Sequence, residues 1–188
     1  PIKAETLDPT LFDGAMLRQA GTLLGTVNRG DPTAYPMANG QIRDRTDEFV
    51  ESYKTLGLDG LIVIGGDGSL TILRRLAQAG GLNLIAIPKT IDNDVAGTDR
   101  SIGFHTALTV ATEALDRLQP TAASHGRVMV LEVMGRNAGH IALEAGIAGG
   151  ADVILVPELS YSIDGVAAKI ERLRVSGRNF ALVVAAEG

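Results

Sequence analysis

The stretch LIAIPKTIDNDVAGTD, residues Leu84 to Asp99, decides how the rest of the chain is interpreted. Its first four residues are apolar and stand between a glycine and a proline, which is typical of a short buried strand. In open α/β sheets ligands bind beyond the carboxyl ends of strands. Three carboxylates within eight residues, Asp92, Asp94 and Asp99, repel one another unless a cation, a sugar hydroxyl or a base-like role uses them. The alternative is an Asx-turn loop, in which Asn93 and the aspartates hydrogen-bond their own backbone.

A second candidate ligand turn lies upstream. The apolar run LIVI at 61–64 is typical of a central parallel strand, and it is followed by GGDGS at 65–69 and by a helical stripe of leucines. A strand, a glycine turn and a helix together offer bare backbone N–H groups and a positive helix end to a phosphate. Asp67 would repel phosphate oxygens unless a divalent metal lay between them, and Mg²⁺ characteristically bridges carboxylates and phosphates. A plain glycine turn is the alternative.

Strand-like and helix-like segments alternate through the rest of the chain. An amphipathic helix is predicted over 42–56, and a longer one over 104–119 that Pro120 should end. Further strands are predicted over 127–134, 153–157 and 180–186, and further helices over 141–147 and 163–175. The turn GRNAG at 135–139 joins the first of these strands to the first of these helices. This alternation predicts an α/β fold of doubly wound, Rossmann-like parallel sheets. We expect parts of two domains, 1–103 and 104–188, with the ligand cleft between them.

The first forty residues carry the weakest pattern. A short helix is predicted around 9–19, followed by a loop rich in glycine, asparagine and proline over 21–40. Arg29 and Asp31 in this loop either reach a ligand or belong to a solvated surface.

Composition excludes several classes of function. The net charge is −5 and no Lys/Arg run exceeds two residues, so no cationic surface for nucleic acid or membrane is predicted. No apolar segment approaches the roughly 20 residues of a membrane span. The chain has no cysteine, which excludes disulfides and thiolate metal sites and fits the cytoplasm. Its three histidines share no metal-ligand spacing. Because it begins at Pro1 and stops just after a strand-like run, we expect it to be part of a longer protein.

Four motifs together resemble the 6-phosphofructokinase family. They are GGDGS at 65–69, PKTIDND at 88–94, GTD at 97–99 and EVMGR at 132–136, and TIDND is much more specific than GGDGS. The resemblance covers residues 21 to 187. It implies a glycolytic kinase that transfers a phosphoryl group from ATP to the 1-hydroxyl of fructose 6-phosphate, giving fructose 1,6-bisphosphate.

The resemblance also implies roles for individual residues. Asp67 would hold Mg²⁺ in a nucleotide-phosphate site lined by Gly65, Gly66, Gly68 and Ser69. Asp92 would be the general base that accepts the sugar-hydroxyl proton. Thr90 and Arg136 would contact the transferring phosphoryl group, and Lys89 is counted with these catalytic residues. The sugar-phosphate site would comprise Thr90, Asp92, Asp94, Arg127, Met134, Gly135, Arg136 and Glu187. In the family, the arginine at the position of Arg127 reaches a neighbouring subunit's site, which implies a homotetramer.

The chain also departs from the family pattern. It lacks the family's amino-terminal glycine-rich turn and the carboxyl-terminal His and Arg residues of the sugar-phosphate pocket, so by itself we expect it to be inactive. An arginine that bridges the two substrates is expected near Asn28 and Arg29. Gly68 resembles ATP-using forms, whereas Lys89 is common in pyrophosphate-using ones; ATP is favoured and pyrophosphate is the alternative. An alternative of another class is a non-catalytic nucleotide- or sugar-phosphate-binding module.

Overall fold

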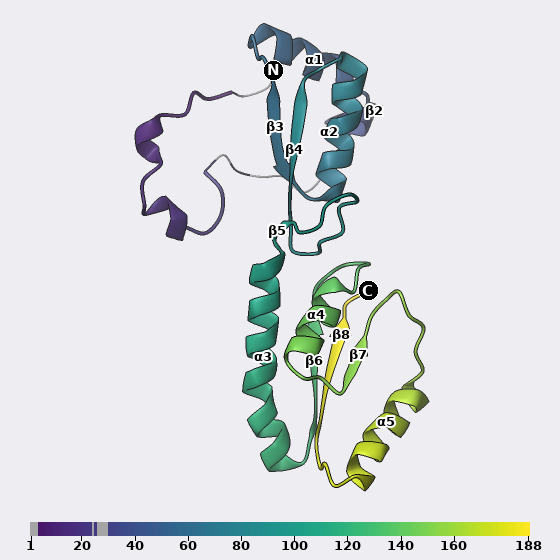
Figure 1. Cartoon of the computed structure of the whole chain (residues 1–188). Helices are drawn as coiled ribbons and strands as arrows, with labels where there is room; N and C mark the ends of the chain where they lie inside the picture. Colours follow the sequence, from purple (N-terminus) through teal and green to yellow (C-terminus); the bar gives the residue numbers. More distant parts are fainter. Residues whose placement is uncertain (1–3, 24, 26–29) are drawn as a thin grey trace. The chain divides into compact units, whose positions relative to one another are not determined.

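The computed structural model describes residues 4–23, 25 and 30–188 (Figure 1). The chain divides into two compact units, one of residues 1–63 and 68–86 and the other of residues 64–67 and 87–188. The predicted domain boundary near Gly103 concerns the domains of a whole protein, and it stays a prediction. Within the described residues, no helix has the length and apolar character needed to cross a bilayer.

The first unit opens with short, locally stabilised turns. Two 3₁₀ turns, Pro9–Leu11 and Met16–Arg18, stand where one helix was predicted over 9–19, so that prediction is wrong. The reason is local: the Asp8 carboxylate accepts a hydrogen bond from Thr10 N at 2.9 Å, and the Asp13 carboxylate accepts one from Ala15 N at 3.0 Å. Such side-chain to backbone bonds compete with a continuous helix.

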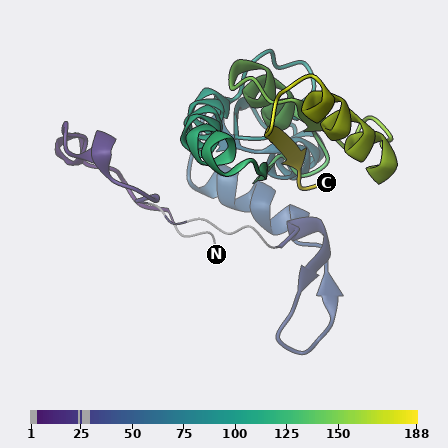
Figure 2. The same ribbon diagram turned by 90° about the horizontal axis from the view of Figure 1, so that it is seen from below.

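A hairpin precedes the first α-helix. Strands β1 (Tyr35–Pro36) and β2 (Ile42–Arg43) pair antiparallel near the start of α1 (Thr46–Thr55), as Figure 2 shows. The helix predicted from residue 42 therefore begins four residues later. Its amphipathic character is as predicted, with Phe49 and Val50 partly buried.

The strands that flank the acidic stretch belong to one three-stranded sheet. Its order is β3 (Leu61–Gly65), β4 (Leu84–Thr90) and β5 (Ile102–Gly103). Among the described residues β3 is an end strand with Ile62 and Ile64 exposed, and no residue of β4 is fully buried, so the predictions of a central strand at 61–64 and a buried one at 84–87 are wrong. The predicted helix after the glycine turn is α2 (Asp67–Gly80). Strand β4 continues past Pro88, because Lys89 and Thr90 pair with β5. It pairs parallel with β5, Thr90 opposite Gly103.

The second unit contains a parallel sheet in the order β6 (Val128–Val133), β8 (Ala181–Ala186), β7 (Val153–Leu155). Its central strand β8 is buried from Ala181 to Val184, as expected for a continuous apolar run. Helices α3 (Phe104–His125) and α4 (His140–Ala148) pack on it, and α5 (Ile163–Val175) lies on the other side of β8 from α3 (Figures 1 and 2). The predicted α/β fold with parallel sheets is confirmed.

Helix α3 does not end at Pro120, contrary to the prediction. Pro120 is exposed within the helix, whereas Leu115 and Ala122 on the packed face are almost completely buried. Burial of this face offsets the lost backbone hydrogen bond. The helix ends instead at Gly126, whose left-handed φ of 60° suits a glycine C-cap.

Candidate functional site

The glycine turn at 65–69 meets the end of the neighbouring strand. Gly65 ends β3, and Asp67 begins α2 with an exposed side chain. A Cβ built on Gly66 would stand 3.7 Å from Thr90 Cβ. Gly66 therefore lies beside Thr90, where β3 and β4 reach their carboxyl ends. Gly68 and Ser69 lie in the exposed first turn of α2.

The acidic loop begins where β4 ends. Lys89 is exposed and Thr90 is partly buried, and the Thr90 hydroxyl accepts a hydrogen bond from Asp92 N at 3.1 Å. Asp92 and Asp94 are both half-buried. The Oδ1 atom of Asp94 is fully buried and has no hydrogen-bond partner among the described residues.

Charged groups from three segments affect the pKa of Asp92. Burial raises the pKa of the Asp92 carboxyl, and the nearby carboxylates of Asp94 and Glu187 raise it further. The Thr90 hydroxyl and the Arg136 guanidinium act in the opposite direction and lower the pKa. Asp92 is thus a partly desolvated carboxylate, and its raised pKa strengthens it as a proton acceptor.

The loop from Met134 to Gly139 supplies the arginine. It leaves β6 with two left-handed residues, Gly135 at φ 144° and Arg136 at φ 57°. One carboxylate oxygen of Glu187 accepts hydrogen bonds from Arg136 N at 2.8 Å and from Gly135 N at 3.3 Å. Glu187 follows β8, the neighbour of β6 in the sheet. The parallel register therefore brings Met134, Gly135, Arg136 and Glu187 to one sheet edge.

Some predicted residues are not brought to this cluster. Arg127 precedes β6, whereas Met134 follows it, so about 20 Å of strand separates them. Asp31 caps the turn Pro32–Ala34 and pairs with Arg75 at 2.7 Å, which supports a structural role for it. Asn28 and Arg29 lie outside the described residues.

Three contributions to the site could not be recognised from sequence patterns. Glu158 follows β7, and its carboxylate accepts a hydrogen bond from Gly139 N at 2.8 Å, at the far end of the arginine loop. Ser101 is 4% exposed, and its hydroxyl donates a hydrogen bond to Thr90 O, which connects the end of the acidic loop to its start. Arg100 pairs with Glu144 of α4 at 2.6 Å. The available signal was position: Glu158, like Glu187, follows a parallel strand of one sheet.

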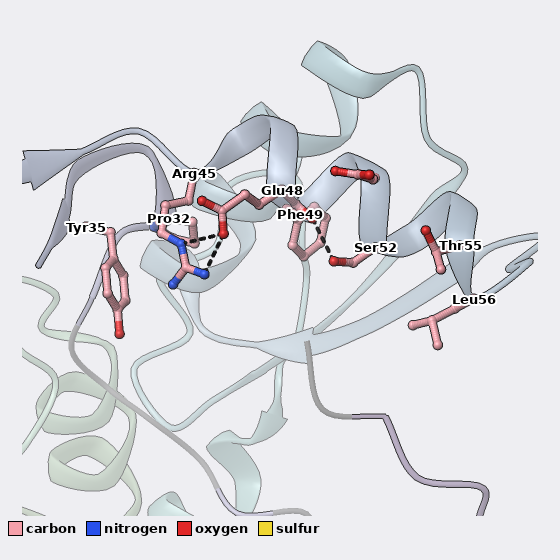
Figure 3. Close-up of a pocket in the computed structure, with 9 residues that line it drawn as sticks. Pro32, Tyr35, Arg45, Glu48, Phe49, Ser52, Thr55 and Leu56 are labelled. Carbon is pink, nitrogen blue, oxygen red and sulfur yellow. Dashed lines mark hydrogen bonds and ion pairs between the residues drawn. The ribbon is translucent and has the colours of Figure 1, made fainter. Parts of the chain in front are cut away.

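A pocket elsewhere in the first unit does not coincide with these residues. It has a volume of about 500 Å³, and Tyr35, Arg45, Glu48 and Phe49 are among the residues that line it (Figure 3). The size would suit a small molecule. Two of its charged groups, Arg45 and Glu48, already pair with each other, however, since Arg45 Nη2 lies 2.6 Å from Glu48 Oε2 and the guanidinium stacks on Tyr35.

The described residues contain no group of three acidic, His or Cys side chains that could enclose a metal ion. In a phosphate site Mg²⁺ keeps several waters and takes only one or two carboxylates. The exposed Asp67 carboxylate fits such a minimal role.

Comparisons with known proteins agree with one another. The family model described as Phosphofructokinase matches residues 3–188. The chain is 63% identical over 187 residues to ATP-dependent 6-phosphofructokinase 1 of Synechocystis sp., covering 100% of this chain and 52% of that protein. It is 57% identical to ATP-dependent 6-phosphofructokinase 1 of Nostoc sp., covering 99% of this chain and 50% of that protein. The chain spans about half the length of the curated relatives it matches.

Solved structures give the same result. Phosphofructokinase from Saccharomyces cerevisiae superposes with a TM-score of 0.70 at 34% identity, covering 89% of this chain and 24% of that one. A pyrophosphate-dependent phosphofructokinase from Nitrosospira multiformis gives 0.69 at 29% identity, covering 77% and 40%.

Proposed function

The chain belongs to the phosphofructokinase family, and on that premise we propose that the protein it forms part of transfers a phosphoryl group from ATP to the 1-hydroxyl of fructose 6-phosphate. The relatives named ATP-dependent 6-phosphofructokinase support ATP as the donor. Phosphoryl transfer requires positioned reactants and neutralised charge more than covalent chemistry by the protein. The active enzyme would be a cytoplasmic homotetramer, with Arg127 serving a neighbouring subunit's site. The chain alone would not turn over.

The observation that carries this proposal is the environment of Asp92. A half-buried carboxylate with a raised pKa, within electrostatic range of Arg136, suits a base that takes the proton of a sugar hydroxyl. Such a base contributes on the order of 10²–10⁴ in rate. Arg136 would stabilise negative charge on the phosphoryl oxygens through charged hydrogen bonds. Thr90 and Lys89 would orient the same group.

The remaining residues would bind the two substrates. Asp94, Met134, Gly135 and Glu187 would contact the sugar phosphate. The glycine turn would bind the nucleotide phosphates through Gly65, Gly66, Gly68 and Ser69. Asp67 would hold Mg²⁺, which when bound neutralises charge on the donor phosphates.

The test is Asp92→Ser in the full-length protein, with Asp116→Ser as the matched control. Asp116 is an exposed aspartate of α3, so its replacement should leave turnover unchanged. Asp92→Ser should lower kcat by at least 100-fold, with little change in the affinity for ATP measured by equilibrium binding. A kcat equal to that of the control would remove Asp92 from the mechanism.

A pyrophosphate-dependent enzyme is the second candidate. The structural likeness to a pyrophosphate-dependent phosphofructokinase and the presence of Lys89 favour it. Coupled assays of the full-length protein with each donor separate the two, and turnover with pyrophosphate alone would reverse the choice. Binding of both substrates without turnover with either donor would favour the non-catalytic binding module.

A further inference from the structure

The acidic loop from Ile91 to Ser101 is closed by one asparagine. Asn93 has φ 54°, in the left-handed region that few residues other than glycine adopt, although asparagine tolerates it best. Its Oδ1 accepts a hydrogen bond from Ser101 N at 2.8 Å, and its Nδ2 donates one to Asp99 O at 3.2 Å. One side chain therefore connects the start of the loop to its end.

Ser101 completes the closure from the other side. Its hydroxyl donates to Thr90 O at 2.8 Å and lies 3.2 Å from Asn93 Oδ1, so two acceptors share one proton. Ser101 is 4% exposed and is the one buried polar residue among those the structure describes. A buried hydroxyl without these partners would be costly, which makes the position intolerant of any rearrangement of the loop.

Asp92 lies between the two residues held in this way. Thr90 precedes it and is fixed through its carbonyl by Ser101, and its hydroxyl accepts Asp92 N at 3.1 Å. Asn93 follows it and is fixed by Ser101 and Asp99. The backbone on both sides of Asp92 is therefore restrained, while none of these bonds uses the Asp92 carboxylate.

We propose that Asn93 and Ser101 are positioning residues that hold the Asp92 carboxylate in its reactive place without contacting the substrates. This inference rests on the proposed role of Asp92 as the base. A displacement of a reacting group by about 1 Å can cost on the order of 100-fold in rate. Loss of either residue should therefore reduce kcat, with little effect on substrate binding.

The test uses Asn93→Gly and Ser101→Ala in the full-length protein. Glycine adopts φ 54° freely, so Asn93→Gly removes the hydrogen bonds without adding backbone strain. Each variant should lower kcat by about 10- to 100-fold and leave both KM values within about threefold. Ser101→Thr keeps the hydroxyl and should restore most of the activity. Ser124→Ala removes an exposed serine hydroxyl on α3 and should change nothing.

The outcomes separate this inference from the proposed function. A kcat like that of wild type in both Asn93→Gly and Ser101→Ala, alongside an Asp92→Ser enzyme that has lost turnover, overturns the positioning role alone. An unchanged kcat in Asp92→Ser overturns the proposed base and this inference with it. If Ser101→Ala unfolds, seen as a lowered thermal midpoint, Asn93→Gly decides the question. A rise in KM at constant kcat also contradicts the proposal, because it would place these residues in substrate binding.

Discussion

Removal of the Glu158 carboxylate should loosen the arginine loop. Glu158 Oε1 accepts the Gly139 N–H at 2.8 Å, and Gly139 is the N-cap of α4, so Glu158 satisfies the N-cap N–H as the glutamate of a capping box does. Loss of such a cap typically costs about 1 kcal/mol. A hydrogen bond to a charged acceptor can be worth about 1.5–3 kcal/mol. Because Glu158 is exposed, solvent screens this bond, and the cost of about 1 kcal/mol for a lost cap applies. A free energy of about 1 kcal/mol corresponds to roughly fivefold in local opening.

The assay is hydrogen exchange at the Gly139 amide, followed by mass spectrometry in the full-length protein. Glu158→Ala should exchange there about fivefold faster than wild type. Glu158→Gln keeps an uncharged acceptor and should lie between the two, since charged hydrogen bonds are about twice as strong. Glu171→Ala, at an exposed position of α5, is the matched control. Equal exchange in Glu158→Ala and this control would refute the reasoning.

The same bond should respond to pH. The Gly139 N–H is the main cause that lowers the pKa of Glu158, followed by the residue's own backbone N–H, with a smaller effect of His140. Because the folded pKa lies below the unfolded one, the stabilisation is complete above the ordinary glutamate pKa. It is lost as pH falls through the lowered value. Exchange in wild type, corrected for its intrinsic rate, should therefore approach that of Glu158→Ala in acid.

Three further outcomes follow from the same structure. Leu115→Ala on α3 should destabilise the protein by about 2–5 kcal/mol, because Leu115 is 1% exposed, whereas Val110→Ala at a 63% exposed site should cost less than about 0.5 kcal/mol in urea unfolding. The acid limb of the kcat/KM profile should lie above the ordinary aspartate pKa of about 3.9, because the base must be ionised and its pKa is raised; a limb at or below that value would contradict the Asp92 assignment. Gly68→Asp should fold, since nothing lies within 4 Å of its Cβ, and should raise the KM for ATP; an unchanged KM would remove Gly68 from the nucleotide site.

Apolar runs predicted where the strands lie, although they predicted burial correctly only for β8, since Ile62, Ile64 and Ile85 are exposed. The run Ala181–Ala186 became the central strand, covered on both faces, and Leu61–Ile64 lies within β3. Segments that depend on distant partners could not be predicted in this way. Residues 42–45 carry a helical charge pattern, yet Ile42 and Arg43 pair with β1. Pro120 has the local chemistry of a helix end, and only the packed face of α3 overrides it.

The candidate site also contains features that local sequence predicts and features that depend on distant partners. Motifs with unusual chemistry, the glycine turn and the acidic loop, are predicted to be ligand segments from the sequence alone, and that role stays a prediction. Glu158 and Ser101 have no such signature, since an isolated serine or glutamate in a loop is ordinary. Their contacts depend on the order of the strands in each sheet: Glu158 reaches Gly139 across an interval of 19 residues and Ser101 reaches Thr90 across 11. Strand order therefore had to be known before either could be assigned.

The acidic stretch is interpreted either as a ligand segment or as an Asx-turn loop, and aspartates elsewhere in the chain show what the second interpretation would require. Asp8, Asp13, Asp31 and Asp44 each accept a hydrogen bond from a backbone N–H two residues further on, as aspartates in Asx-type turns do.

In the 91–101 loop, it is Asn93 that accepts a backbone N–H, from Ser101 at the end of the loop. Across the described chain, no backbone N–H donates to the carboxylates of Asp92 or Asp94, and Asp94 Oδ1 is buried without any partner. If the aspartates served only the turns of this loop, their carboxylates would accept backbone N–H groups, because an unpaired buried carboxylate oxygen is destabilising. The asparagine satisfies the backbone of the loop, which supports the ligand role proposed above for the two carboxylates.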